Sequence, residues 1–351
     1  MQINREELIK RLMLADASFL TFREKTVLEK NLDSPDALAI MSIDDISSMV
    51  KRTFGKAHWD AGYSLDQAAK NSIILEKLGI NFAFYDSEDY PAMFKEMTDP
   101  PYAVFYRGDI KCLKNSVVSV VGTRRATNDG RKAAFDFGKD ASDNGTVVVS
   151  GLAFGIDIAS HRGALSGALG KTCAVLPSGI DKIVPGAHIK EAAKIIEKGG
   201  CVLSEYTPLT EVQAFRYIQR NRLIAALSPA TVVIQAPAGS GAMTTASLAL
   251  DYNRYVFFSQ VCLGKESELL YDVVEGELKK TALIQKNKEK LIAGKLNNSP
   301  KNYIQEGAPV IKNYAEYAEY MHNGMHNGSE PLKKVNTDGQ LDLFKADSQK
   351  E

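Results

Sequence analysis

The sequence predicts an α/β fold, a Rossmann-like doubly wound parallel sheet preceded by a small all-helical N-terminal domain. From about residue 116, short apolar runs rich in β-branched residues alternate with amphipathic stretches at helical spacing. The runs are nearly continuous, as strands buried on both faces should be. Such βαβ alternation is typical of a parallel sheet with helices on both sides. Before about residue 76, helical spacing without strand-like alternation predicts the separate helical domain.

The predicted elements of the sheet domain follow one another along the chain. The strands are Val117–Val121, Thr146–Val149, Thr172–Leu176, Cys201–Leu203, Thr231–Ile234 and Tyr255–Phe258. The helices between them are Arg131–Asp143, Asp157–Leu169, Ile189–Lys198, Arg216–Leu227 and Thr244–Asn253. Two further strands, Ile80–Tyr85 and Ala103–Tyr106, precede this unit.

We expect three parts. Residues 1–75 form a SAM-like helical domain, in which Ser42 and Asp45 have the spacing of a capping box. Residues 76–320 form the sheet domain, with a Lys/Glu-rich helical insertion at about 264–299 and a return to the sheet near Tyr303–Val310. Residues 321–351 are polar and predict a flexible tail.

Composition limits the classes of function. Acidic and basic residues number 43 each, so a nucleic-acid partner cannot be argued from bulk charge and any basic site must be local. The four cysteines are far apart without a CxxC pair, so we expect neither a metal site nor a disulfide framework. The N-terminus lacks a signal-peptide pattern, and no apolar run approaches the ~18 residues of a membrane span. We therefore expect a cytoplasmic protein with no membrane partner.

Three glycine-containing turns follow predicted strands, at Val121–Thr127, Ser150–Asp157 and Ala238–Thr245. In a parallel sheet such turns lie at the carboxyl edge, where backbone N–H groups and helix N-termini can hold anions. The alternative is that these glycines only make tight turns. The candidate binding residues in the turns are Arg124, Gly151, Phe154, Gly155, Gly239, Ser240, Gly241 and Thr245.

A dinucleotide cofactor is not expected. The G-x-G-x-x-G fingerprint is absent after the first strand of the βαβ unit, where Arg124 stands in place of the second glycine. The spacing Gly239-x-Gly241 falls late in the fold and is followed by threonine. We expect no cofactor.

A basic and aromatic cluster, Phe215–Arg222, opens one predicted helix. Arginine matches phosphate geometry, and an aromatic face stacks on an unpaired base with ~1–3 kcal/mol. The alternative is a solvated helix start whose aromatic side chains join the core. The candidate DNA-binding residues here are Tyr217, Arg220, Asn221 and Arg222.

These motifs together resemble the DprA/Smf family of DNA-processing proteins over roughly residues 80–260. The matching runs are Tyr90-Pro91, Asp99-Pro100-Pro101, Val121-Gly122-Thr123-Arg124, Ser150-Gly151-Leu152-Ala153, Gly155-Ile156-Asp157, His161, Gly179-Ile180-Asp181, Leu203-Ser204-Glu205-Tyr206, Arg220-Asn221-Arg222 and Ser240-Gly241 with Thr245-Ala246. The resemblance implies a non-enzymatic homodimer that binds single-stranded DNA at these loop ends and helps to load the recombinase RecA during uptake of transforming DNA. Asp157 and His161 match motif positions too, and we interpret both as scaffold.

The chain departs from the family pattern at several positions. The family's Phe-Pro before Arg-Asn-Arg is Tyr217-Ile218 here, and its Glu after the fifth-strand valines is Gln235. The segment Tyr303–Ala308 is displaced by the charged insertion. These departures affect the expected dimer and RecA surfaces more than the DNA pocket.

The tail contains an isolated apolar peptide, Gln340-Leu341-Asp342-Leu343-Phe344. It resembles the peptide by which bacterial proteins dock on the DNA polymerase sliding clamp, with Gln340, Leu341, Leu343 and Phe344 as anchors. The alternative is that the peptide folds back on its own domain.

Two other functions remain open at this point. The glycine loops also resemble nucleoside-monophosphate glycoside hydrolases of the LOG group, which need a carboxylate at the anion loop. The third loop has no carboxylate, and Glu205 would be the residue to change in a test of that activity. The other alternative is a sensor that binds a small nucleotide.

Overall fold

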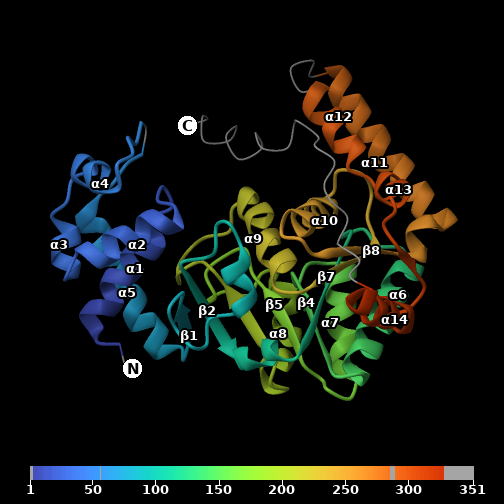
Figure 1. Cartoon of the computed structure of the whole chain (residues 1–351), viewed down its shortest axis with the longest axis horizontal. Helices are drawn as coiled ribbons and strands as arrows, with labels where there is room; N and C mark the ends of the chain where they lie inside the picture. The colour runs from blue at the N-terminus through green and yellow to red at the C-terminus, as the bar shows by residue number, and fades with distance from the viewer. Residues whose placement is uncertain (1–2, 56, 285–288, 328–351) are drawn as a thin grey trace.

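The computed structural model describes residues 3–55, 57–284 and 289–327. A nine-stranded sheet crosses the molecule in the order β1-β2-β6-β5-β4-β3-β7-β8-β9 (Figure 1). Strands β3 to β9 pair in parallel, and β1 and β2 are added antiparallel at one edge. The strands are β1 (Asn81–Phe84), β2 (Ala103–Gly108), β3 (Ser116–Gly122), β4 (Thr146–Ser150), β5 (Thr172–Val175), β6 (Cys201–Ser204), β7 (Ala230–Gln235), β8 (Tyr255–Ser259) and β9 (Val310–Ile311).

Helices cover both faces of the sheet, as doubly wound topology requires. On one face α9 (Ala214–Ala226) and α10 (Gly241–Asp251) pack on the strands. On the other face lie α6 (Asn128–Asp143), α7 (Ile156–Ser166) and α8 (Ile189–Glu197). Side chains of β3 pack into the hydrophobic clusters on both faces of the sheet. Val117 and Val121 point to one face, and Val118 and Val120 point to the other. The predicted fold class is confirmed.

Capping residues explain why two helices begin three residues earlier than predicted. The Thr127 side chain accepts a hydrogen bond from Gly130 N at 3.1 Å and starts α6. The Ser240 side chain accepts one from Met243 N at 3.4 Å and starts α10. Both hydroxyls satisfy donors of the first helical turn, so the glycines that follow are helical.

The N-terminal part is all-helical, as predicted. It comprises α1 (Arg5–Asp16), α2 (Phe22–Asn31), α3 (Pro35–Ala39), α4 (Ile43–Val50) and α5 (Ala61–Lys77). The Ser42–Asp45 capping box at α4 is confirmed. Residue 75, the expected end of this domain, lies within α5, whose last turn continues to Lys77.

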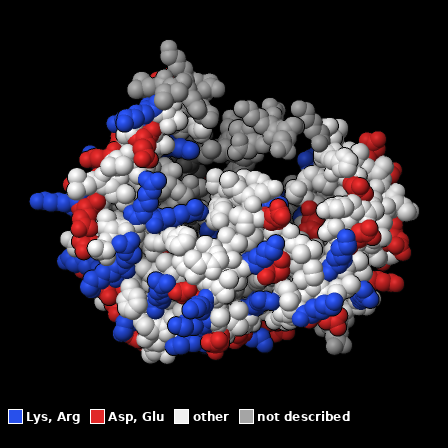
Figure 2. Space-filling view, turned by 180° about the vertical axis from the view of Figure 1, so that it is seen from behind, with Lys and Arg blue, Asp and Glu red and all other residues white. Residues whose placement is uncertain are grey.

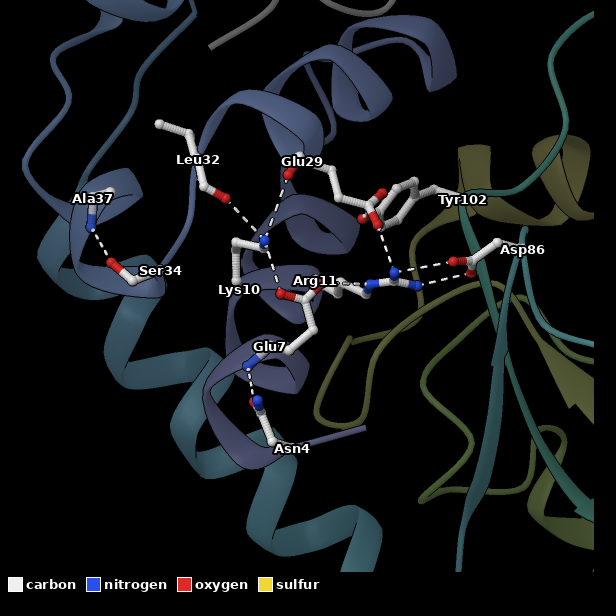
Figure 3. A network of polar contacts seen from close by, with 10 residues as sticks. All are labelled: Asn4, Glu7, Lys10, Arg11, Glu29, Leu32, Ser34, Ala37, Asp86 and Tyr102. Carbon is white, nitrogen blue, oxygen red and sulfur yellow. Dashed lines mark hydrogen bonds and ion pairs between the residues drawn. The ribbon is translucent and has the colours of Figure 1, made fainter. Parts of the chain in front are cut away.

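The helical part is attached to the sheet by both apolar and polar contacts. Buried residues of α1 and α2 share one hydrophobic cluster with Phe84 and Phe105 of β1 and β2. Figure 3 shows the polar side of this junction: Arg11 donates to both carboxylate oxygens of Asp86, at 2.8 and 3.0 Å. Arg11 also pairs with Glu29, which accepts a hydrogen bond from the Tyr102 hydroxyl. The helices are therefore fixed to the sheet edge.

The described residues of the charged insertion are largely helical, as predicted, in α11 (Lys265–Ile284) and α12 (Glu289–Asn297). The chain then forms α13 (Pro300–Gln305), and β9 extends the sheet beside β8. One expectation is wrong: residues 321–327 do not begin the tail but complete α14 (Tyr314–Asn327). Tyr317 packs against Phe137 and Phe257 and holds this helix on the sheet domain. The clamp-like peptide 340–344 lies outside the described residues.

On the face of the molecule drawn in Figure 2, basic and acidic side chains are interspersed, and neither sign of charge covers the whole face. This pattern agrees with the balanced charge of the sequence. Among the described helices, none combines the length and apolar character needed to cross a bilayer.

Candidate nucleic-acid interface

The turns after β3 and β4 meet at the carboxyl edge of the sheet. Gly155 has a φ of +79°, and a Cβ on it would lie 2.2 Å from the carbonyl oxygen of Thr123. The next residue, Ile156, donates its N–H to the same oxygen at 3.3 Å. Glycine at 155 is needed for this close approach. The first two predicted loops are thus in direct backbone contact.

Arg220 lies beneath this junction instead of facing outward. Its side chain is 3% exposed and donates to the carbonyl oxygens of Gly151, at 2.7 Å, and Val175. Burial lowers its pKa to about 10, partly offset by the charge of the buried Asp157. Burial also raises the pKa of Asp157, whose carboxylate accepts a hydrogen bond from Gly151 N at 3.2 Å. The sequence predicted that Arg220 contacts DNA. In this structure its guanidinium is buried and anchors the second loop instead.

Arg222 and Asn221 are also engaged within the protein. Arg222 forms an ion pair with Glu205 and donates to the carbonyl oxygen of Asp99 at 2.8 Å. Asn221 donates its side-chain N–H to Gly241 O at 3.1 Å and so connects α9 to the start of α10. In this structure the Arg-Asn-Arg motif holds the loop ends in place.

Three side chains that face solvent at this edge are Arg124, Arg125 and Phe154. The Arg124 guanidinium lies 4.8 Å from the centre of the Tyr217 ring, a cation–π arrangement at the first turn of α9. Phe154 is half exposed and packs edge-on against His188, with ring centres 4.7 Å apart. We call the exposed surface of these four residues, Arg124, Arg125, Phe154 and Tyr217, the Arg124 rim.

Arg125 was missed as a candidate by sequence reasoning. Its position next to Arg124, in the same turn, was the available signal. Its side chain is highly exposed and lies 4.0 Å from Glu277 of α11. An ion pair this exposed contributes little stability, so Arg125 remains able to exchange the carboxylate for another anion.

The third predicted loop is covered by the insertion. Gly239 has a φ of +63° and donates its N–H to Asn298 O at 2.8 Å. A Cβ on Gly239 would lie 2.7 Å from the Cβ of Lys295. Ser240 caps α10, and the buried Thr245 hydroxyl donates to Gly241 O at 3.0 Å. The sequence predicted that Gly239 would present its N–H to a phosphate, but a main-chain carbonyl accepts that hydrogen bond.

Gln235 explains how the insertion is attached to the first loop. Its side-chain Oε1 accepts from Thr127 N at 2.9 Å, while its Nε2 donates to Thr127 Oγ1 at 3.0 Å and to Ser267 Oγ at 2.5 Å. Ser267 belongs to α11, and Tyr271 of the same helix accepts a hydrogen bond from Ala236 N. A carboxylate could accept but not donate here. The glutamine at this position therefore suits a chain in which a helix closes over the end of β7.

His161 and Glu205 lie inside the protein. His161 Nδ1 is 2.8 Å from the Thr172 hydroxyl, which itself donates to Val148 O, so the ring donates to Thr172. Burial lowers the pKa of His161 to about 3. Glu205 is paired with Arg222, and burial raises its pKa. Both groups are thus engaged with protein side chains in the interior, His161 with Thr172 and Glu205 with Arg222.

The comparisons with known proteins agree with this architecture. Residues 81–321 match the family model described as DNA recombination-mediator protein A. Protein Smf of Borreliella burgdorferi is 30% identical over 273 residues, which cover 77% of this chain and 85% of that protein. DNA processing protein DprA of Bacillus subtilis is 37% identical over 180 residues, covering 51% and 60%.

A solved structure extends the likeness to most of the chain. The X-ray structure of DNA processing protein A from Streptococcus pneumoniae aligns with a TM-score of 0.62 at 25% identity. The alignment covers 91% of this chain and 98% of that one. At that coverage it extends into the N-terminal helices, which lie outside the residues matched by the family model. The chain belongs to the DNA recombination-mediator protein A family, whose members are also named DprA or Smf.

Proposed function

We propose that this protein binds single-stranded DNA at the Arg124 rim and acts in DNA recombination without catalysis of its own. The observation that carries the proposal is the exposed Arg124 guanidinium lying over the Tyr217 ring, where the first two glycine loops meet the start of α9. A guanidinium can pair with a phosphate, while an aromatic face accepts an unpaired base of any identity. The membership of a DNA-processing family supports the same reading.

The arrangement favours a single strand over a duplex for a physical reason. Phe154 and Tyr217 can stack only on bases that are not already paired and stacked within a double helix. The loop anchors Arg220 and Arg222 are engaged with protein oxygens and contribute no phosphate contact. Binding thus depends on a few exposed cations and on stacking, and we expect a modest salt dependence.

Fluorescence anisotropy with a labelled oligonucleotide tests the proposal. The exposed rim arginines, Arg124 and Arg125, can neutralise about two phosphates, which should give a log–log salt slope of about −1.4 for a single strand. Arg124→Ala should weaken binding about tenfold or more and make the slope shallower by about 0.7. Arg162→Ala is a control, because this exposed arginine of α7 pairs with Glu191 and is not one of the rim residues. A flat salt response, or equal affinity for blunt duplex, would contradict the proposal.

The finer role is proposed on the family resemblance. The protein works in the cytoplasm as a homodimer that protects single strands taken up during transformation or formed in recombination, and it helps to load RecA. Sedimentation analysis should give twice the chain mass, and RecA filament assembly on coated single strands should accelerate when the protein is added. Unchanged assembly would remove RecA loading from the proposal and leave DNA binding untouched.

A further inference from the structure

A patch of exposed apolar side chains lies between β6 and the first turns of α9. Leu209, Val212, Phe215 and Ile218 each leave 39–45% of their surface exposed. The four side chains lie in one short segment of the chain, and contiguous exposed apolar surface often marks a binding site. We call these four residues with Arg216 the Phe215 patch.

The segment that carries the patch is held rigidly. Leu209 has a φ of +66°, a left-handed conformation that costs a leucine ~1–2 kcal/mol. Its N–H donates to Asp181 Oδ1 at 3.0 Å, and the Thr210 carbonyl accepts from Gly179 N at 2.9 Å. The Thr207 hydroxyl donates to Asp16 of α1. A strained residue persists only where its surroundings fix it, so the patch is preorganised.

A stack of two rings and a guanidinium forms the centre of the patch. The Arg216 guanidinium lies 4.9 Å from the centre of the Tyr206 ring and 5.6 Å from that of Phe215. One of its N–H groups donates to Glu211 O at 2.5 Å, whereas the buried Nε finds no hydrogen-bond partner among the described residues. The guanidinium is therefore placed by the rings and one carbonyl, and Phe215 remains 42% exposed beside it.

We propose that the Phe215 patch binds unpaired bases of the strand whose phosphates lie on the Arg124 rim. This inference rests on the proposed function and adds a second contact of different chemistry. Arg216 and Tyr217 are neighbours in the first turn of α9, so the patch lies within one helical turn of the rim residue Tyr217. Segment 208–218 contains one basic residue, Arg216, and one acidic residue, Glu211, so the net charge of the segment is zero. Its contribution comes from stacking, worth ~1–3 kcal/mol per base.

The signature of stacking is a loss of affinity that does not depend on salt. Phe215→Ala should weaken binding of a short oligo(dT) between about five-fold and a hundred-fold, with the salt slope unchanged. Arg124→Ala should instead make the slope shallower. Phe215→Trp should retain or tighten binding, whereas Phe215→Leu should lose as much as the alanine variant, because leucine keeps apolar contact without a ring. Phe135→Ala, at an exposed phenylalanine of α6, is the matched control.

An abasic oligonucleotide completes the test. It has the same phosphates without the bases, so wild-type protein should bind it more weakly than oligo(dT), and Phe215→Ala should cause no further loss. If Phe215→Ala binds oligo(dT) as wild type does while Arg124→Ala does not, the inference is wrong and the proposed function stands. If Phe215→Leu binds normally, the patch makes plain apolar contacts and the stacking proposal is overturned. If wild-type protein binds no oligonucleotide, the proposed function itself fails.

Discussion

The Arg220 guanidinium lies against the Cα of Gly151, so close that a Cβ on this glycine would come within 2.5 Å of Nη1. The arginine uses that space to donate to Gly151 O, while Asp157 accepts from Gly151 N. Two buried, oppositely charged side chains thereby hold both backbone polar groups of Gly151 in the second loop, its C=O and its N–H. The conformation of the loop depends on a residue about 70 positions further along the chain.

Arg220→Ala should destabilise the fold rather than remove a DNA contact. The substitution leaves the Asp157 carboxylate buried without its main cationic partner and leaves two buried carbonyls without a donor. We expect the free energy of unfolding to fall by ~3–5 kcal/mol, measured by urea denaturation. Gly151→Ala should act in the same direction because it displaces the guanidinium. Arg124→Ala, at an exposed position, should change stability by less than ~0.5 kcal/mol.

The opposite result would restore the expected role of Arg220. A stable Arg220→Ala variant that binds DNA as weakly as Arg124→Ala would show that the guanidinium reaches the strand. Binding should therefore be compared at equal concentrations of folded protein, at a temperature well below each variant's Tm.

The sequence itself contains a signal for the burial of Arg220. The residue precedes Leu223 and Ile224 by three and four positions, so it shares the face of α9 that packs on the sheet. Arginine type and the nearby aromatics suggested an outward side chain, whereas helical phase indicated an inward one. Phase prevails because two large apolar side chains set the rotation of the helix.

Contacts between residues that are far apart in the sequence could not be predicted from local sequence patterns. The contact of Gly239 with Lys295 and Asn298 joins residues more than 50 positions apart, across a helical insertion. The cysteines, widely spaced in the sequence, gather as well: Cys201 Sγ lies 3.3 Å from Cys173 Sγ and 3.7 Å from Cys112 Sγ. Periodicity predicts elements and their buried faces, but strand order and the docking of an insertion are set by tertiary packing.

Gly239→Ala tests whether the third loop has a structural or an anion-binding role. Alanine at a φ of +63° is strained, and its Cβ would meet the backbone of Lys295. We expect the free energy of unfolding to fall by ~2 kcal/mol, with unchanged DNA affinity of the folded protein. Loss of affinity at full stability would favour the phosphate contact that the sequence predicted.

Gly276→Ala is the control for the effect of a methyl group near the insertion. This glycine lies inside α11, and a Cβ on it would meet nothing within 4 Å. Alanine should therefore stabilise the helix by up to ~1 kcal/mol through its higher helix propensity. If Gly276→Ala raises the free energy of unfolding while Gly239→Ala lowers it, the loss at 239 comes from strain in the third loop and not from a general intolerance of this region to substitution.

The buried His161 should make stability fall as the pH is lowered. Its folded pKa of about 3 lies below the ordinary value of 6.5, so between these values the unfolded chain takes up a proton that the folded protein excludes. From about pH 7 to about pH 5 this linkage should remove ~2 kcal/mol of stability. His161→Gln should lack this part of the slope in urea denaturation, and the exposed His58→Gln should keep it. Equal slopes for wild type and His161→Gln would show that the imidazole is not held neutral.

The tail peptide yields a prediction independent of the fold. Leu343 and Phe344 are large apolar side chains in a polar stretch, the pattern of a short peptide that fills an apolar groove on a partner. We propose the DNA polymerase sliding clamp as that partner. Deletion of residues 338–351 should abolish binding to immobilised clamp and leave oligonucleotide affinity unchanged, since the Arg124 rim lies in loops of the sheet domain.

Point substitutions separate the peptide from the rest of the tail. Gln340→Ala and the pair Leu343→Ala with Phe344→Ala should each reproduce the loss of clamp binding. The neighbouring Lys345→Ala is the matched control, because it keeps both apolar anchors and the glutamine. Surface plasmon resonance with the full-length chain provides the comparison, and a free peptide of residues 338–346 should compete. Clamp binding that survives the double alanine substitution would exclude this peptide as the docking element.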